Sequence, residues 1–379
     1  MLKNKIYKYF FNEILKNFIT ILLTFTALAW VVRAVNFLDL MVEDGYSSLI
    51  YFKYSILNIS TIISRFTPLA FLLSLTISIV KFERQQELLI LWTTGLTKLK
   101  IVNIFLLIGF LITLFQLILS LFINPFLLNK SRSLLSSSEP IEINNVLKSN
   151  DFNAAFSGVT FYIDEKNSNN ELLNVFIKDT EGSLSTIVDE VDGKKNSTIF
   201  AKKGFIENDK LILFNGMIQT LGKENKIKNI LFERTELSLA SISPRTIKHP
   251  KIQETSSFSL LECAFDLNIN LNKKKCSKNF KKETAQTLSR RMGTPLYIPL
   301  VSIITSFLLI HRKEKTNNFL KKYILFIFSF ITLVLSEILL RYTSLSSLMT
   351  FLYFIIPLSA TFLFYIYIFK KIMTERVVK

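Results

Sequence analysis

Residues 81–100, KFERQQELLILWTTGLTKLK, decide how the chain is organised. The stretch separates two long apolar runs, and Lys or Arg residues stand at both of its ends. Because Lys and Arg concentrate on the inner side of short membrane loops, the stretch is predicted to face the cytoplasm. Four apolar residues between the basic ends recur at roughly helical spacing: Leu88, Leu89, Leu91 and Trp92. This pattern predicts a short amphipathic helix just below the bilayer, which Gly95 ends.

The apolar face of this helix has two interpretations. The chain contains no cytoplasmic domain that could cover it, so a partner protein would explain it. Alternatively, the leucines and the tryptophan rest on lipid headgroups, as in interfacial helices. Composition alone does not distinguish the two.

The composition places the chain among integral membrane proteins. Of its 379 residues, 50% are hydrophobic and 13% are aromatic, with 35 Phe, and the apolar residues gather in runs too long for a soluble domain. The net charge of +17 would also suit a nucleic-acid-binding protein. However, much of the Lys and Arg flanks the apolar runs, where topology accounts for it, and we predict no nucleic-acid partner.

Six apolar runs predict six spanning helices, near residues 14–35, 56–80, 101–123, 295–310, 323–340 and 348–369. The first run is long enough to span and no cleavage pattern follows it, so it should remain as the first helix. Asn124-Pro125 is expected to end the third span. The four predicted inner segments hold four, four, five and four Lys or Arg residues, against two and one in the short outer segments. Both termini are therefore predicted to be cytoplasmic.

The chain changes character between the third and fourth runs. Residues 126–255 are polar and contain short runs in which apolar and polar residues alternate, with turn-forming residues between them. This predicts an inserted extracytoplasmic all-β domain, an antiparallel sandwich or jelly roll. Residues 256–294 are expected to form a helix and linker back to the membrane. The expected plan is three spans in residues 1–125, with the amphipathic helix near 83–95, and three more in residues 295–379.

No catalytic or metal-binding constellation is found in the sequence. The only histidines, His249 and His311, lack a second His or Cys at ligand spacing, so neither a metal nor another cofactor is expected. The phosphate-binding pattern G-x-x-x-x-G-K-[ST] does not occur. The chain is therefore not expected to be an enzyme, and if ATP powers it, another polypeptide hydrolyses the ATP.

The two cysteines, Cys263 and Cys276, both lie in the predicted extracytoplasmic part. A periplasm would be oxidising, which favours a disulfide between them. Two unpaired thiols are equally compatible with the sequence, which does not show whether the side chains meet.

Four charged residues lie inside or at the ends of apolar runs: Arg33, Arg65, Glu337 and Arg341. Charges at such positions are costly and usually face a cavity or a partner. Glu337 and Arg341 are four residues apart and can pair with each other on one helix. Arg33 and Arg65 have no such local partner. They can snorkel to headgroups, or, with Arg341, bind an anionic ligand between spans one, two and five.

Three features together resemble the LptF/LptG (YjgP/YjgQ) family of lipopolysaccharide export permeases. Glu87, Leu88, Leu91 and Gly95 are in register with the family pattern Glu-Leu-x-x-Leu-Arg-Ala-x-Gly, although Trp92 replaces its Arg. LSRRMGTPL (residues 288–296) is similar to the family's Arg-Arg-x-x-x-Pro-Leu entry to the fourth span. The plan of three spans, a β-jelly roll and three spans is also that of the family. Residues 33–47 look more like LptF than LptG.

The resemblance implies a permease subunit of an ATP-driven exporter. It would extract lipopolysaccharide from the bacterial inner membrane and pass it to a periplasmic β-jelly-roll bridge. Residues Glu87, Leu88, Leu91, Trp92 and Gly95 would couple it to the ATPase, although Trp92 removes one polar contact that the family makes there.

The resemblance also implies a lipid site and a set of partners. Arg33, Arg65 and Arg341 would bind the lipid A phosphates. The partners would be an LptB-like ABC ATPase dimer, an LptG-like second permease, and LptC-like and LptA-like bridge proteins.

Two other function classes compete with this interpretation. A membrane-anchored sensor or scaffold would use its β domain to bind a periplasmic ligand, and its arginines would be structural. Permeases of the macrolide-exporter kind also use a separate ATPase. They have four spans with the insert after the first, which this chain does not match.

Overall fold

A computed structural model describes residues 5–42, 46–137, 149–156, 158–167, 171–180, 197–207, 210–221, 227–238, 251–264, 278–309 and 318–377. The chain divides into two compact units. Unit 1 comprises Met1–Val32, Leu57–Lys130 and Pro250–Lys379, and unit 2 comprises Arg33–Ile56 and Ser131–His249.

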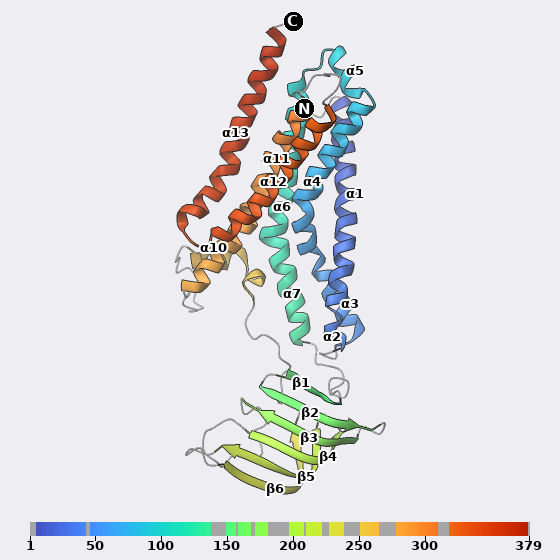
Figure 1. Cartoon of the computed structure of the whole chain (residues 1–379), viewed down its shortest axis with the longest axis vertical. Helices are drawn as coiled ribbons and strands as arrows, with labels where there is room; N and C mark the ends of the chain where they lie inside the picture. The colour runs from blue at the N-terminus through green and yellow to red at the C-terminus, as the bar shows by residue number, and fades with distance from the viewer. Residues whose placement is uncertain are drawn as a thin grey trace. The chain divides into compact units, whose positions relative to one another are not determined.

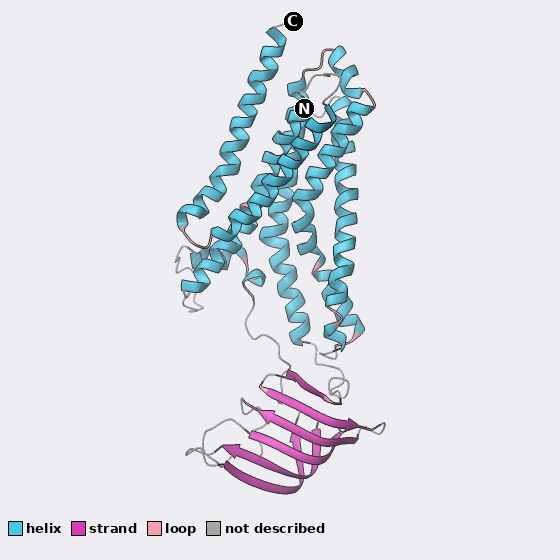
Figure 2. Cartoon of the chain, viewed as in Figure 1, coloured by secondary structure: helices cyan, strands magenta, loops and turns pink. Residues whose placement is uncertain are grey.

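Along the chain, the helices form two series, one before the β strands and one after them; Figures 1 and 2 show these elements. The first series is α1 (Lys5–Asn36), α2 (Asp39–Val42), α3 (Ser48–Leu57), α4 (Ile59–Arg84), α5 (Glu87–Thr93), α6 (Lys98–Ile118), the π-helical turn η1 (Leu119–Ile123) and α7 (Asn124–Ser137). The second is η4 (Ile252–Glu254), α9 (Ser257–Ala264), α10 (Lys278–Met292), η5 (Thr294–Leu296), α11 (Tyr297–Ser306), η6 (Phe307–Leu309), α12 (Asn318–Tyr342) and α13 (Ser347–Val377).

Six stretches are long and apolar enough to cross a membrane: Lys5–Val42, Ser48–Arg84, Lys98–Ser136, Phe280–Leu309, Lys322–Tyr342 and Ser347–Thr374. This confirms the six predicted spans. Three of them form the centre of unit 1, because the apolar windows of the second, third and fourth stretches are 56%, 50% and 72% buried. The windows of the first, fifth and sixth stretches are only 17% buried, so these helices are peripheral.

The third span does not end at Pro125, as the sequence had suggested. The chain continues from α6 through η1 into α7 without a break. Pro125 has no N–H to donate to the carbonyl of Leu121, four residues earlier. The hydroxyl of Ser257 donates to that carbonyl at 2.6 Å instead. A neighbouring helix thus satisfies the freed carbonyl, which lets the proline remain inside a membrane helix.

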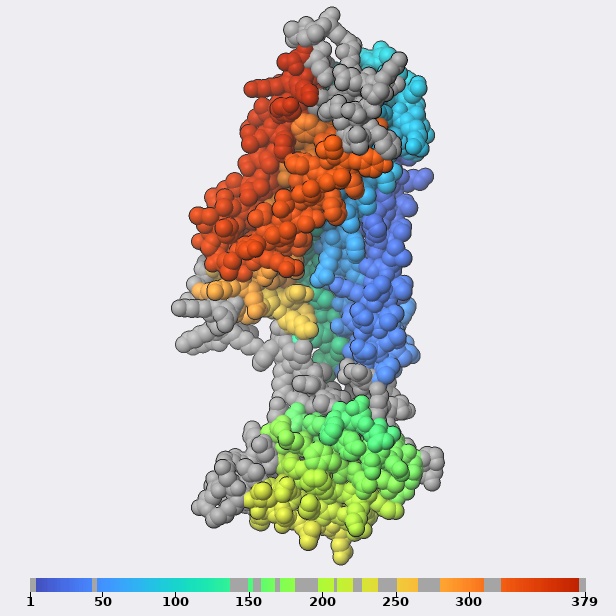
Figure 3. All heavy atoms as spheres, viewed as in Figure 1, coloured from blue at the N-terminus to red at the C-terminus, as the bar shows by residue number. Residues whose placement is uncertain are grey.

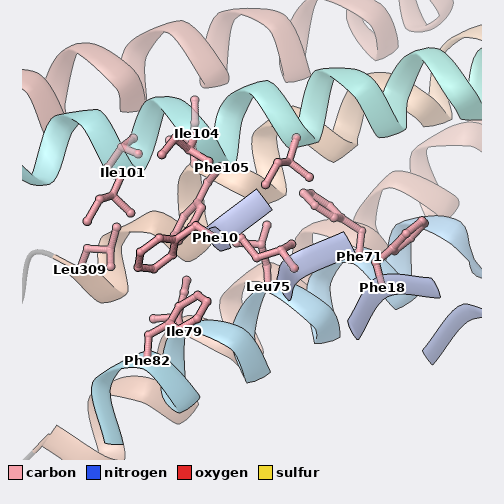
Figure 4. Packing of buried hydrophobic residues seen from close by; sticks show 14 of the residues in the cluster. Phe10, Phe18, Phe71, Leu75, Ile79, Phe82, Ile101, Ile104, Phe105 and Leu309 are labelled. Atoms are coloured by element: carbon pink, nitrogen blue, oxygen red, sulfur yellow. The ribbon is translucent and has the colours of Figure 1, made fainter. Parts of the chain in front are cut away.

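The core of unit 1 is built from aromatic and aliphatic side chains of α1, α4, α6 and the α11–η6 segment (Figure 4). Phe10 and Phe82 lie in its centre with ring centroids 4.4 Å apart. Small residues let α6 and α11 approach closely, since a Cβ on Gly109 would lie 3.2 Å from Cβ of Ser302. Such contacts stabilise helix pairs in a membrane. There, burying an apolar side chain between helices gains little free energy, because the lipid around it is equally apolar.

Six strands form one antiparallel sheet in unit 2. They are β1 (Asp151–Phe156), β2 (Val159–Lys166), β3 (Glu171–Asp179), β4 (Ser197–Glu207), β5 (Lys210–Leu221) and β6 (Ile227–Ser238). Their order in the sheet is their order in the chain, a meander (Figure 2). The inserted all-β domain is therefore confirmed. Alternating apolar residues of these strands make a buried cluster that includes Phe161, Ile177 and Ile199.

The alternation of buried side chains changes phase part-way along the strands. In β3, both Leu172 and Val175 are buried although they are three residues apart. Asn174 between them has φ +50°, and Asn215 in β5 has φ +48°. Asparagine tolerates this left-handed conformation better than most residues. The two asparagines therefore let each long strand keep its apolar residues on one face across a bend.

Gly216 in β5 is predicted to tolerate no side chain. A Cβ there would lie 2.1 Å from the carbonyl oxygen of Phe200 and 2.5 Å from Cζ of Phe232. Gly216→Ala should destabilise the sheet by about 1–3 kcal/mol. The temperature at which the sheet becomes protease-sensitive in the full chain should then fall by at least about 4 °C.

The matched control is Gly204→Ala, whose nearest neighbour is the flexible end of Leu213 at 3.0 Å. This variant should shift the cleavage temperature less. Equal shifts for the two variants would contradict the packing around Gly216.

Candidate functional site

The predicted amphipathic helix exists as α5, and its end is well defined. Gly95 has φ +89°, a conformation that favours glycine. Its N–H donates to the carbonyl of Trp92 at 3.2 Å, and the N–H of Leu96 donates to the carbonyl of Leu91 at 3.0 Å. These two hydrogen bonds make a Schellman motif. Gly95 therefore ends α5, as the sequence predicted.

The two faces of α5 have different surroundings. Leu88 is 3% exposed and Leu91 is 9% exposed, and both belong to the core of unit 1. Trp92 packs against the same core, with Nζ of Lys98 5.2 Å from its ring centroid. Leu89 and Ile90 are 45% and 58% exposed. Three of the predicted docking residues thus hold α5 to its own chain, and the apolar side chains left for a partner are Leu89 and Ile90.

Glu87 begins α5 and is bonded to the first span. Its Oε1 accepts a hydrogen bond from the hydroxyl of Tyr9 at 3.1 Å. Tyr9 lies in the first helical turns of α1, at the same end of unit 1 as α5 (Figure 1). The sequence indicates Glu87 but not Tyr9, because 78 residues separate them along the chain and no spacing pattern connects them.

The three arginines of the predicted phosphate site lie on separate helices. Arg33 is in the last turn of α1 and belongs to unit 2, whereas Arg65 on α4 and Arg341 on α12 belong to unit 1. Arg65 and Arg341 are exposed and Arg33 is half-buried. Because the units are described separately, a common site for the three residues stays a prediction.

The pairing of Glu337 with Arg341 that their spacing allows is not present. Oε2 of Glu337 lies 3.7 Å from Nη2 of Arg290 on α10, and no ion pair joins Glu337 to Arg341 within the described part of the chain. Both partners of the observed pair are largely exposed. Arg341 is consequently less neutralised than its spacing from Glu337 suggested.

Arg291 is a structural arginine whose role the sequence did not indicate. It is 6% exposed, and its Nη atoms donate to the carbonyls of Gln253 and Thr255 at 2.9 and 3.1 Å. It also donates to Oγ of Ser257 at 2.8 Å, and its own carbonyl accepts from Ser120 at 2.7 Å. Arg291 therefore fastens the segment that precedes the fourth span to α10 and to the π-helical turn.

A second apolar surface crosses the sheet on the face opposite the buried cluster. One residue from each strand contributes to this aromatic stripe: Phe152, Tyr162, Phe176, Phe200, Met217 and Leu231. Neighbouring rings touch, with centroids 4.8 Å apart for Phe152 and Tyr162 and 5.1 Å for Phe176 and Phe200. A groove of about 1050 Å³ opens over the last five members. Leu231 is 82% exposed.

The remaining candidates lie wholly or partly outside the residues that the structure describes. Cys263 is buried at the end of α9, but Cys276 falls outside the described residues, so the disulfide stays a prediction. His249 and His311 also fall outside them. Among the residues that are described, no group of three or more His, Cys, Asp or Glu side chains could hold a metal ion.

The assignment of the two faces of α5 predicts opposite effects for two adjacent leucines. Leu88→Ala should destabilise unit 1 by about 2–5 kcal/mol, because it leaves a cavity in the core. Leu89→Ala should change stability by no more than about 0.5 kcal/mol, because its side chain is largely exposed. Thermal unfolding of the detergent-solubilised chain measures the loss of stability in each variant. Similar losses of stability in the two variants would show that Leu88 does not face the core and Leu89 the outside, as assigned.

Comparison with known proteins identifies the family. A search of curated proteins finds no match. The model of a family described as "Lipopolysaccharide export system permease LptF/LptG" matches residues 8–371, which include the β-sheet and all six spans except the first and last few residues of the outermost two. The chain therefore belongs to the LptF/LptG family of lipopolysaccharide export permeases.

Proposed function

We propose that this chain is the subunit through which a separate ABC ATPase drives the extraction of lipopolysaccharide. Its family makes it a multi-pass permease of the inner membrane and a transport subunit. The ATPase is proposed to be LptB-like and dimeric. An LptG-like second permease is proposed to complete the pore, in line with the resemblance of this chain to LptF.

The observation that carries the proposal is that one face of α5 is buried in the core and the other is exposed. Leu88 and Leu91 fix this short helix to the core, while Leu89 and Ile90 present an apolar surface next to Glu87. A helix held in this way can transmit a push to the helices beneath it. The proposed occupant of the surface is the ATPase, because the chain has no phosphate-binding loop of its own.

The proposed membrane topology of the chain follows from the place of α5 and from the distribution of Lys and Arg. The first turns of α1, the end of α13 and α5 lie at one end of unit 1 (Figure 1). Lys and Arg concentrate in the segments at that end, which supports a cytoplasmic location for it and for both termini. The β-sheet, inserted after three spans, is then proposed to lie in the periplasm.

We assign two contacts to the lipid along its route. The exposed guanidinium groups of Arg65 and Arg341, together with Arg33, are proposed to bind the phosphates. The aromatic stripe is proposed to receive acyl chains before LptC-like and LptA-like proteins take them on. The stripe fits this role better than the buried cluster of the same sheet, whose side chains are already packed against one another. Six strands about 4.8 Å apart give the stripe a length of about 24 Å.

Docking of the ATPase is expected to depend on the exposed face of α5. Replacing Leu89 and Ile90 with Asp should reduce co-purification of the ATPase with the tagged chain by at least about tenfold, as for interface residues worth 2 kcal/mol or more. Thr374→Asp, an exposed change in α13 at the same end, is the control. Normal co-purification of the double variant would remove α5 from the interface. If a signalling protein co-purified with the wild-type chain in place of an ATPase, the result would favour the function of a membrane-anchored sensor.

Capture of the lipid is expected to require Arg65. Arg65→Gln should weaken lipopolysaccharide binding by about tenfold to a hundredfold, because a hydrogen bond to a charged group contributes about 1.5–3 kcal/mol. Lys16→Gln removes the same charge from the other end of the spans and should leave binding unchanged. Quantitative photo-crosslinking of radiolabelled lipopolysaccharide at position 66 measures both. Equal binding by both variants would make Arg65 a snorkelling anchor.

The aromatic stripe is expected to contact lipid only during transport. A photo-crosslinker at Leu231 should capture lipopolysaccharide when the partner ATPase is supplied with ATP and not before. Asn229, two residues away on β6 and exposed, is the matched control outside the stripe. Capture of lipopolysaccharide at both positions, or at Leu231 without ATP, would contradict the proposal that the lipid passes over the stripe during transport.

A further inference from the structure

We propose that the turn between α4 and α5 is a transmission hub, and that Tyr9 is the positioning residue that links it to the first span. This α4–α5 corner comprises residues 81–87. Side chains of the corner bond to α1 on one side and to α12 on the other. The inference rests on the proposed function, because a hub needs a motor that moves it.

The corner itself is a tight turn closed by backbone hydrogen bonds. Gln86 has φ +59°, an uncommon conformation for a residue other than glycine. The N–H groups of Gln85 and Gln86 donate to the carbonyls of Lys81 and Glu83 at 3.0 and 3.1 Å. Phe82 is fully buried immediately before the turn, and Leu88 is buried just after it. A force applied to α5 therefore reaches the end of α4 without loss in a flexible loop.

The first span is attached to the corner by three consecutive contacts. Tyr9 donates its hydrogen bond to Glu87, Phe10 packs on Phe82, and Glu13 forms an ion pair with Lys81. Beyond these contacts α1 presents only one stripe of buried residues, spaced four apart, and most of its apolar surface is exposed. Farther along, α1 is also bonded to α4, since Nδ2 of Asn17 donates to Oγ of Ser78 at 2.9 Å and Ser74 donates to the carbonyl of Ile14. At the corner, however, a hydrogen bond, a ring contact and an ion pair follow one another within the first turns of α1.

The fifth span is attached to the same corner from its other side. Nζ of Lys322, at the start of α12, lies 2.7 Å from Oε2 of Glu83. The apolar window of α12 is as little buried as that of α1. Figure 3 shows α1 in blue on one flank of unit 1 and α12 in orange crossing the face of the unit diagonally. One corner therefore connects two peripheral spans that run in different directions.

The chemistry of these contacts suits a transmission role. Both ion pairs and the Tyr9 hydrogen bond involve partly exposed side chains, so they can adjust their geometry without leaving a buried charge unpaired. The helices they attach have little other packing to overcome. The proposal thus assigns to Glu87 a bond to α1 in addition to any contact with the ATPase.

Tyr9→Phe isolates the link, since it removes the hydroxyl and keeps the ring that faces Phe82 at 6.2 Å. In vesicles containing the chain, the second permease and the ATPase, this variant should hydrolyse ATP at close to the normal rate. The amount of lipopolysaccharide released per ATP hydrolysed should fall by about fivefold or more. A factor of about five is the smallest effect typical of energetic coupling between two sites. Lys322→Met should act in the same direction through α12, and the double variant should lose more than either.

Charge reversal provides the matched control. Glu13→Lys should uncouple the complex, and adding Lys81→Glu should restore release per ATP by re-forming the pair in the opposite sense. Unchanged release per ATP in Tyr9→Phe would overturn the hub, and so would loss of the ATPase from that variant, since Tyr9 would then be a docking residue.

A measurement without nucleotide separates this inference from the proposed function. Spin labels at Ile6 on α1 and Thr93 on α5, both exposed, should give one narrow distance distribution in the wild-type chain and a broad one in Tyr9→Phe. Equal widths would overturn the link whether or not the chain transports lipid. A wild-type complex that releases no lipopolysaccharide with ATP, but shows the narrow distribution, would refute the proposed function and leave the link standing.

Discussion

The close packing of α4, α6 and α11 is the constraint on which the rest of the structure depends. In lipid, helices gain little from burying apolar side chains, so they associate where small residues allow intimate contact. Gly109 and Ser302 provide such a contact between α6 and α11. Polar side chains add to it. The hydroxyl of Thr113 on α6 donates to the carbonyl of Pro295, just before α11, at 3.4 Å, and Nε2 of Gln116 on α6 donates to the carbonyl of Ser64 on α4 at 3.1 Å.

A rigid centre leaves the other spans free to take on different roles. The first, fifth and sixth spans each contact the centre along a narrow face, and this is the arrangement expected of helices that move or meet a partner. The α4–α5 corner lies at one end of the unit, where Leu88 and Leu91 anchor α5 to the core. Elsewhere in unit 1, Arg291 joins α10 to the segment formed by η4 and the start of α9. Transport would then use peripheral helices that the moving corner carries along the fixed α6–α11 pair.

The sequence predicts the spans and the inserted sheet because both follow from local hydropathy and alternation. It does not predict which face of α5 meets the core, because a helix of seven residues with five apolar side chains has no clear polar face. The ion pair of Glu337 with Arg290 was not predicted for a related reason, since Arg290 is distant in sequence and reaches Glu337 only through the fold. The stripe on the sheet was missed because its phase depends on the left-handed backbone of Asn174 and Asn215.

The account is tested most directly by determining the structure of the complete transporter in nucleotide-free and ATP-trapped states. It predicts that the α4–α5 corner moves together with the attached ends of α1 and α12. The Tyr9–Glu87 and Lys322–Glu83 contacts should then keep their lengths in both states while α6 and α11 stay in place. A corner that shifts while both contacts break and the two spans remain where they were would contradict it.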